Sequence, residues 1–111
     1  MDFSTFVKAG KLRQKVVDIE GIGEVVLTEL SGKEAVDRNT EADNIASDSL
    51  EIIHDHMRKW ACRMLKGSVP TKAELKLVKD NYSIDVIIEI YRNGLVYASL
   101  SPEANEELEK N

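Results

Sequence analysis

The feature that most constrains this chain is a pair of short β-branched runs separated by a turn that contains two glycines. The runs are KVVDI (15–19) and EVVLTEL (24–30), and Glu20-Gly21-Ile22-Gly23 lies between them. A tight reversal of the chain needs positive φ angles, which glycine adopts without a steric penalty. The sequence therefore predicts an antiparallel β-hairpin over about 15–30.

Such a hairpin needs a partner layer. Val17 and Ile19 fall on the same face as Val25 and Leu27, and a two-stranded sheet is only marginally stable while that face is open. Hydrophobic residues make up 42% of the chain, with two Phe, three Tyr and one Trp, so aliphatic helices are the expected cover. The expected fold class is α+β, mostly α-helical, with an N-terminal hairpin packed against a small helical bundle.

Capping boxes mark where two of the helices begin. In the segments SGKE (31–34) and TKAE (71–74) a hydroxyl residue precedes a glutamate by three positions, and the pair satisfies two exposed N–H groups reciprocally. Helices are expected to begin at Gly32 or Lys33 and after Thr71. A further start signal at 40–43 predicts a short helix, a kink and a long helix rather than one rod.

The long helix is defined by its apolar periodicity. Its stripe recurs every three or four residues and comprises Ala42, Ile45, Ala46, Ser49, Ile53, Trp60, Ala61 and Met64, widened by Leu50, Ile52 and Met57. Basic residues crowd its end, and Gly67 is the expected left-handed terminator. A short amphipathic helix is expected at 2–9, ended by Gly10.

The stretch 82–100 supports two interpretations. At a period of two, Ile84, Val86, Ile88 and Ile90 align, and Asn93-Gly94 is a strong hairpin signal. At a period of 3.6 the apolar residues align equally well, and Ser83 is a plausible N-cap. We favour a helix here, with Asn93-Gly94 ending or kinking it. Helices are thus expected over about 32–100.

Length and charge bound the class of protein. At 111 residues, the chain is expected to form one globular domain over 1–100, followed by an acidic helical tail at 101–111 that is frayed. The net charge of −5 disfavours nucleic acid, which is bound largely through Lys and Arg. No run is apolar and long enough to span a membrane, and the lone Cys62 suits a reducing compartment. We expect a soluble cytoplasmic protein.

His54-Asp55-His56 is the most conspicuous cluster of metal-ligating and catalytic residue types. Neighbours one and two positions apart point to different sides of a helix, whereas zinc-binding helices place histidines four apart. We therefore expect a solvated polar face, in which His54 pairs with Arg58 and Asp55 with Lys59. The acids expected on the wet side of the helix are Glu41, Asp43, Asp48 and Glu51.

The remaining candidates have structural interpretations. Cys62 is expected to act as a small hydrophobe, and Trp60 as core rather than as a partner anchor. Gly21-x-Gly23 lies between strands and so lacks the helix N-terminus that makes such loops bind phosphate. No catalytic, cofactor-binding or metal-binding residue is expected, and no cofactor.

Three segments in order resemble the tail assembly chaperones of long-tailed, lambda-like bacteriophages. They are FVKAG (6–10), VVDIEGIGEVVLTELSGKEA (16–35) and VIIEIYRNGLVYASLSPEANEELEKN (86–111). The resemblance implies a non-enzymatic protein of the host cytoplasm, absent from the mature virion. It would bind the tape-measure protein, keep it soluble and help to recruit tail-tube subunits, with self-association also possible.

The resemblance further implies a longer form made by −1 ribosomal frameshifting, and Glu109-Lys110-Asn111 can be encoded GAA AAA AAC, which contains a slippery heptamer. Two other functions stay open. One is a small acidic adaptor or inhibitor, antitoxin-like, that binds a basic protein. The other is a small hydrolase or metal enzyme that uses His54, Asp55 or His56.

Overall fold

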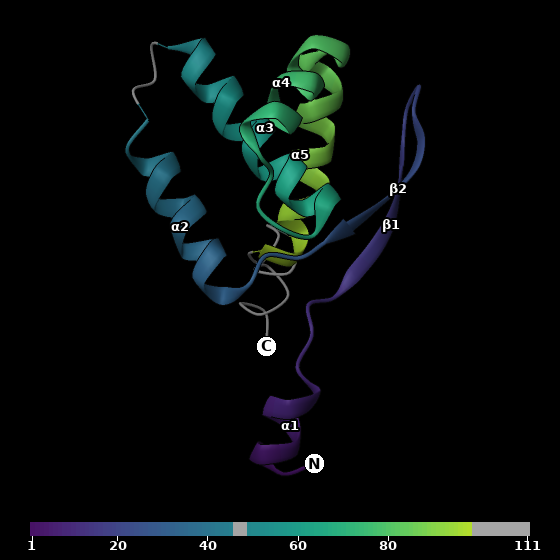
Figure 1. The fold of residues 1–111 in the computed structure, drawn as a ribbon, viewed down its shortest axis with the longest axis vertical. Helices are drawn as coiled ribbons and strands as arrows, with labels where there is room; N and C mark the ends of the chain where they lie inside the picture. The colour runs from purple at the N-terminus through teal and green to yellow at the C-terminus, as the bar shows by residue number, and fades with distance from the viewer. Residues whose placement is uncertain (46–48, 99–111) are drawn as a thin grey trace, which may run out of the picture.

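The computed structural model describes residues 1–45 and 49–98, so the predictions for Asp48 and for the tail at 101–111 lie outside the described residues. The elements are α1 (Phe3–Ala9), β1 (Gln14–Ile19), β2 (Gly23–Thr28), α2 (Gly32–Asp43), α3 (Leu50–Lys66), α4 (Lys72–Asn81) and α5 (Ile84–Ala98). Figure 1 shows α2 to α5 gathered beside the hairpin, with α1 set apart beyond its open end. This architecture confirms the predicted fold class. None of the described helices combines the length and apolar character needed to cross a bilayer.

The hairpin forms as the sequence predicts. β1 and β2 pair antiparallel with Val17 opposite Val25, and Gly21 and Gly23 adopt φ angles of 81° and 103°. Leu27, like Ile19, is fully buried on the face that packs against the helices. The glycine pair is therefore a turn, and no helix N-terminus follows it.

The break between the two following helices falls later than predicted. Ser31 caps α2 with a complete capping box, and the helix begins at Gly32 as expected. The start signal at Thr40 is wrong, because Thr40 lies inside α2 and its carbonyl accepts a hydrogen bond from the Asn44 amide. An N-cap residue needs an extended backbone, which Ser49 supplies just before α3.

The long helix α3 is the centre of the packing. It contacts β2, α2, α4 and α5, and it ends at Gly67, whose φ of 82° is the predicted left-handed cap. Its buried apolar residues include Trp60, Ala61 and Met64, whereas Leu50 and Ile52 are exposed. The predicted stripe is therefore too wide by these two residues and by Ala42, which is exposed on α2, while Ala46 lies outside the described residues.

The ambiguous stretch is a helix. α4 begins with the predicted Thr71 capping box, and α5 then runs to Ala98. Asn93-Gly94 neither ends nor visibly interrupts α5. Gly94 instead lies against Met64, and any Cβ at this position would collide with the Met64 sulfur. This glycine allows α3 and α5 to approach closely. The contact explains why Asn93-Gly94, a dipeptide typical of hairpin turns, occurs inside a helix.

One cluster of buried side chains joins the hairpin to α3 and α5. Its members are Ile19, Leu27, Leu30, Trp60, Ala61, Met64, Ile87, Ile90 and Tyr91. α1 contributes no buried residue, so this helix lies outside the core.

Candidate protein-binding site

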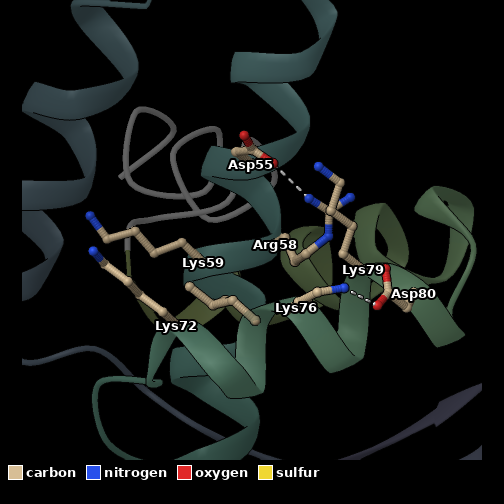
Figure 2. A pocket seen from close by; sticks show the side chains of 8 residues that line it. Asp55, Arg58, Lys59, Lys72, Lys76, Lys79 and Asp80 are labelled. Carbon is tan, nitrogen blue, oxygen red and sulfur yellow. Dashed lines mark hydrogen bonds and ion pairs between the residues drawn. The ribbon is translucent and has the colours of Figure 1, made fainter.

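The side chains of His54-Asp55-His56 diverge around α3. Asp55 is exposed and accepts a hydrogen bond from Arg58 Nη1 at 2.8 Å (Figure 2). His54 is half-buried, but His56 is only 6% exposed, so the predicted solvated face is wrong for His56. Within residues 1–45 and 49–98, no group of three His, Cys, Asp or Glu side chains is arranged to hold a metal ion.

His56 belongs to a polar network that joins three helices. Its Nδ1 lies 2.9 Å from Glu41 Oε1 on α2, and its Nε2 lies 3.0 Å from Tyr91 Oη on α5. In the neutral ring, Nδ1–H donates to the carboxylate and Nε2 accepts from the tyrosine hydroxyl. That hydroxyl in turn accepts from Arg38 Nη1 at 2.8 Å, and Glu41 also accepts from Lys59 at 2.7 Å. The network fixes α2 against α3 and α5.

Glu41 is the second residue for which the predicted solvent-exposed position is wrong, because it is half-buried. Partial burial opposes ionisation, yet hydrogen bonds from Lys59 and His56 hold the pKa of Glu41 below its ordinary value. Asp43 and Glu51 are exposed, as predicted. A sequence signal for the buried histidine did exist, since His56 precedes the core residue Trp60 by one helical turn.

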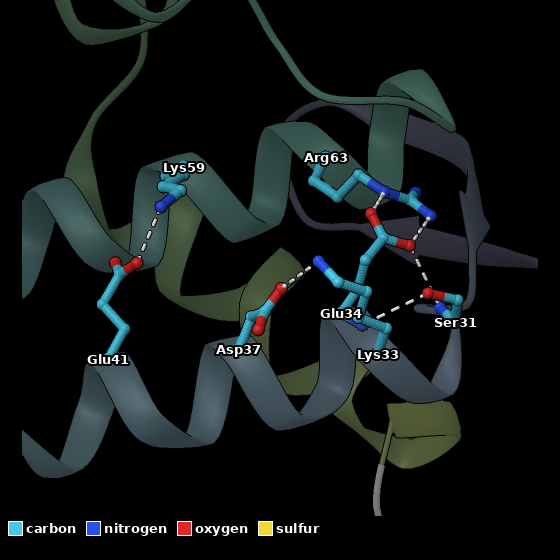
Figure 3. A network of polar contacts seen from close by, with 7 residues as sticks. All are labelled: Ser31, Lys33, Glu34, Asp37, Glu41, Lys59 and Arg63. Carbon is cyan, nitrogen blue, oxygen red and sulfur yellow. Dashed lines mark hydrogen bonds and ion pairs between the residues drawn. The ribbon is translucent and has the colours of Figure 1, made fainter.

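A second polar seam joins the start of α2 to the end of α3. The Arg63 guanidinium, whose side chain is 3% exposed, donates from both Nε and Nη2 to the Glu34 carboxylate, at 2.5 and 2.6 Å (Figure 3). Glu34 also accepts from the Ser31 amide within the capping box. The hydrogen bonds from Arg63, against a smaller opposing effect of burial, lower the pKa of Glu34 to about 2. Glu34, a member of the predicted capping box, thus also forms an ion pair that joins α2 to α3.

Cys62 and Trp60 lie in the interior. Cys62 is 5% exposed, and burial raises the pKa of its thiol, so the reactive thiolate is disfavoured. Trp60 is 6% exposed and belongs to the core cluster, which confirms the predicted core role. Neither residue is positioned to meet a partner.

The exposed apolar side chains instead gather in the N-terminal part of the molecule. On α1, Phe3 and Phe6 are 79% and 65% exposed, and Val7 lies beside them on the same short helix. On the outer face of the hairpin, Val16 and Val26 form a directly opposed, exposed pair. We call α1 together with this face of the hairpin the N-terminal apolar surface. The sequence predicts these elements but not the exposure of their apolar side chains.

An apolar groove of about 240 Å³ adjoins the turn of the hairpin. It is lined by Ile22, Val25, Leu65, Val78, Tyr82, Val86, Ile87 and Ile90. Ile22 and Tyr82 are exposed at its margin, so the groove is open to a partner side chain. The hairpin therefore presents apolar surface both on its outer face and at its turn.

Hairpin, exposed N-terminal helix and helical bundle define a small α+β protein with exposed apolar side chains on α1 and on the hairpin. No family model, curated protein or solved structure matches the chain. A proposal for its function therefore has to rest on its own residues and surfaces.

Proposed function

We propose that this protein is a non-catalytic interaction protein, a tail assembly chaperone of long-tailed bacteriophages that binds the tape-measure protein. It keeps that protein soluble in the host cytoplasm and helps to recruit tail-tube subunits, and it is not retained in the virion. The layout of hairpin, capped helix and C-terminal helix on which the resemblance rests agrees with this proposal.

The observation that carries the proposal is where the exposed large hydrophobic side chains lie. Of the fourteen among the described residues, eight fall within residues 1–26, on α1, its connector and the hairpin. The other six are spread over α2, α3, α4 and the loops. Exposed large apolar side chains that gather on a few elements are typical of protein-binding sites, and an amphipathic helical client would cover those of α1 or of the hairpin with its apolar face.

The test is co-expression of the tape-measure protein with the wild-type chain or with Phe3→Ser/Phe6→Ser. Because neither phenylalanine touches the core, the variant is expected to fold normally, which circular dichroism checks. The wild-type chain should hold the tape-measure protein in the soluble fraction and co-purify with it, and the variant should lose most of this activity.

The matched control is Val36→Ser/Leu77→Ser. These side chains are 62% and 63% exposed, close to the 65% of Phe6, but they lie on α2 and α4. The control should retain binding. Equal loss in both variants would remove the N-terminal apolar surface from the proposal. Failure of the wild-type chain to bind, with co-purification of one small basic protein instead, would favour an acidic adaptor or inhibitor.

A further inference from the structure

A groove between α3 and α4 has the opposite charge from the chain as a whole. Its volume is about 600 Å³, and five basic residues and two acidic ones line it together with Leu75 (Figure 2). The basic residues are Arg58, Lys59, Lys72, Lys76 and Lys79, and the acidic ones are Asp55 and Asp80. The lining is therefore net positive in a protein of net charge −5.

The lysines of this basic groove form a row on α4. Lys72, Lys76 and Lys79 are spaced by four and three residues, so they follow one side of the helix. Like charges at this spacing repel one another by a few tenths of a kcal/mol per pair. The row therefore stores repulsion that an acidic occupant would relieve.

The charges in the groove are partly neutralised, since four of its five cations have a carboxylate partner. Arg58 pairs with Asp55 at 2.8 Å and Lys59 with Glu41 at 2.7 Å. Lys76 pairs with Asp80 at 2.7 Å and Lys79 with Glu51 at 3.8 Å, but both carboxylates are more than half exposed. Lys72 forms no ion pair within the described ranges. Arg58 is 8% exposed, and its buried Nε has no hydrogen-bond partner among the described residues. Exposed pairs of this kind are weak and exchange readily.

The chain itself contains an acidic segment of matching spacing. Residues 101–111 include Glu103, Glu106, Glu107 and Glu109 against the single cation Lys110. Glu103, Glu106 and Glu109 recur at intervals of three residues, close to the intervals of four and three between the α4 lysines. We propose that this acidic segment binds in cis in the basic groove between α3 and α4, with its glutamates facing the lysine row.

The tether makes binding in cis feasible. Glu109 is eleven residues beyond Ala98, the end of α5, and an extended chain spans about 3.3 Å per residue, or about 36 Å in all. The path from Ala98 back to the α4 lysines runs along α5, whose 15 residues span about 22 Å at 1.5 Å per residue. A tether of this length also holds the segment near the groove at an effective concentration of about millimolar, enough for weak ion pairs to form.

The direct test is zero-length carbodiimide cross-linking of the full chain, in an equal mixture of unlabelled and ¹⁵N-labelled protein. We expect amide links between glutamates of 101–111 and Lys72, Lys76 or Lys79, with both peptides of each product carrying the same isotope. Their yield should fall several-fold between 0.1 and 1 M NaCl, because the Debye length drops from about 10 to about 3 Å. Links of mixed isotope, or links confined to lysines outside the groove, would overturn binding in cis.

A second measurement uses two variants that each remove two negative charges. Glu106→Gln/Glu107→Gln should shift the backbone amide resonances of α4 around Lys76. Glu20→Gln/Glu24→Gln, whose glutamates are exposed on the hairpin, should leave those resonances in place. Unmoved α4 resonances in the first variant would contradict the proposal. This outcome does not depend on whether the chain binds the tape-measure protein.

Discussion

The substitution Glu34→Gln tests whether the ion pair with Arg63 anchors α2 on α3. Glutamine keeps the size of the side chain and can still complete the capping box with Ser31. The main change is therefore the loss of a negative charge. It leaves the Arg63 guanidinium, which is 3% exposed, as a buried cation without its carboxylate.

The loss in free energy of unfolding can be estimated from the pKa of Glu34 and from the burial of the pair. The pKa of Glu34 is lowered from 4.5 to about 2, and a shift of this size corresponds to about 3 kcal/mol. Removing one partner from a buried ion pair costs about 3 to 5 kcal/mol. The side chain of Glu34 is 23% exposed, which favours the lower end. We expect the free energy of unfolding at neutral pH to fall by about 3 kcal/mol.

The contribution of Glu34 to the free energy of unfolding should also depend on pH. Because the pKa of Glu34 is lower in the folded protein than in the unfolded chain, its stabilisation is fully present above about pH 4.5. It is lost as the pH falls through about 2. The unfolding free energies of the wild-type chain and Glu34→Gln should therefore converge between these values. Urea unfolding followed by circular dichroism at a series of pH values measures the difference.

Glu74→Gln is the matched control. Glu74 occupies the same position in the Thr71 capping box, and a hydrogen bond from Lys66 likewise lowers its pKa to about 2. The Lys66 side chain is 39% exposed, so removing its partner strands no buried charge, and the loss should be a small fraction of that for Glu34→Gln. Equal losses in the two variants, or a loss below about 1 kcal/mol for Glu34→Gln, would refute the anchor.

Three further predictions concern local packing. Gly67→Ala should lower the free energy of unfolding by about 1 kcal/mol, because Gly67 has a φ of 82°; an unchanged thermal midpoint would contradict this. Cys62 should react with a thiol reagent only as the chain unfolds in urea, since burial hides the thiol and raises its pKa; rapid labelling of the native protein would count against it. Gly94→Ala should destabilise the protein by about 1 to 3 kcal/mol through overpacking against Met64, although alanine favours helices; a higher thermal midpoint would show that the contact is loose.

The parts of the fold that sequence predicts well are those set by neighbouring residues. The hairpin turn at Gly21 and Gly23, the capping boxes at Ser31 and Thr71, and the left-handed cap at Gly67 all depend on a few consecutive positions. Each satisfies its own backbone requirements, so tertiary packing has no reason to override it.

The features that sequence does not predict depend on distant partners. The spacing from Trp60 indicates that His56 faces inward, but not that Glu41, fifteen residues earlier, and Tyr91, thirty-five residues later, satisfy its two ring nitrogens. Gly94 lies against the end of the Met64 side chain on another helix. No local pattern contains these pairings. The N-terminal apolar surface was missed for the same reason, since exposure is known only once the core has been assigned.

The isolation of α1 has a consequence for how it would bind. A seven-residue helix is far shorter than the roughly 12 to 15 residues at which isolated helices become even marginally stable. Its own hydrogen bonds, including the cap in which the Thr5 amide donates to Asp2 Oδ1, therefore hold it only weakly. Part of the free energy gained when a partner covers Phe3 and Phe6 must then be spent on ordering the helix. Binding through α1 would accordingly be weaker per unit of buried area than binding through a rigid surface, which would make such a contact easier to release.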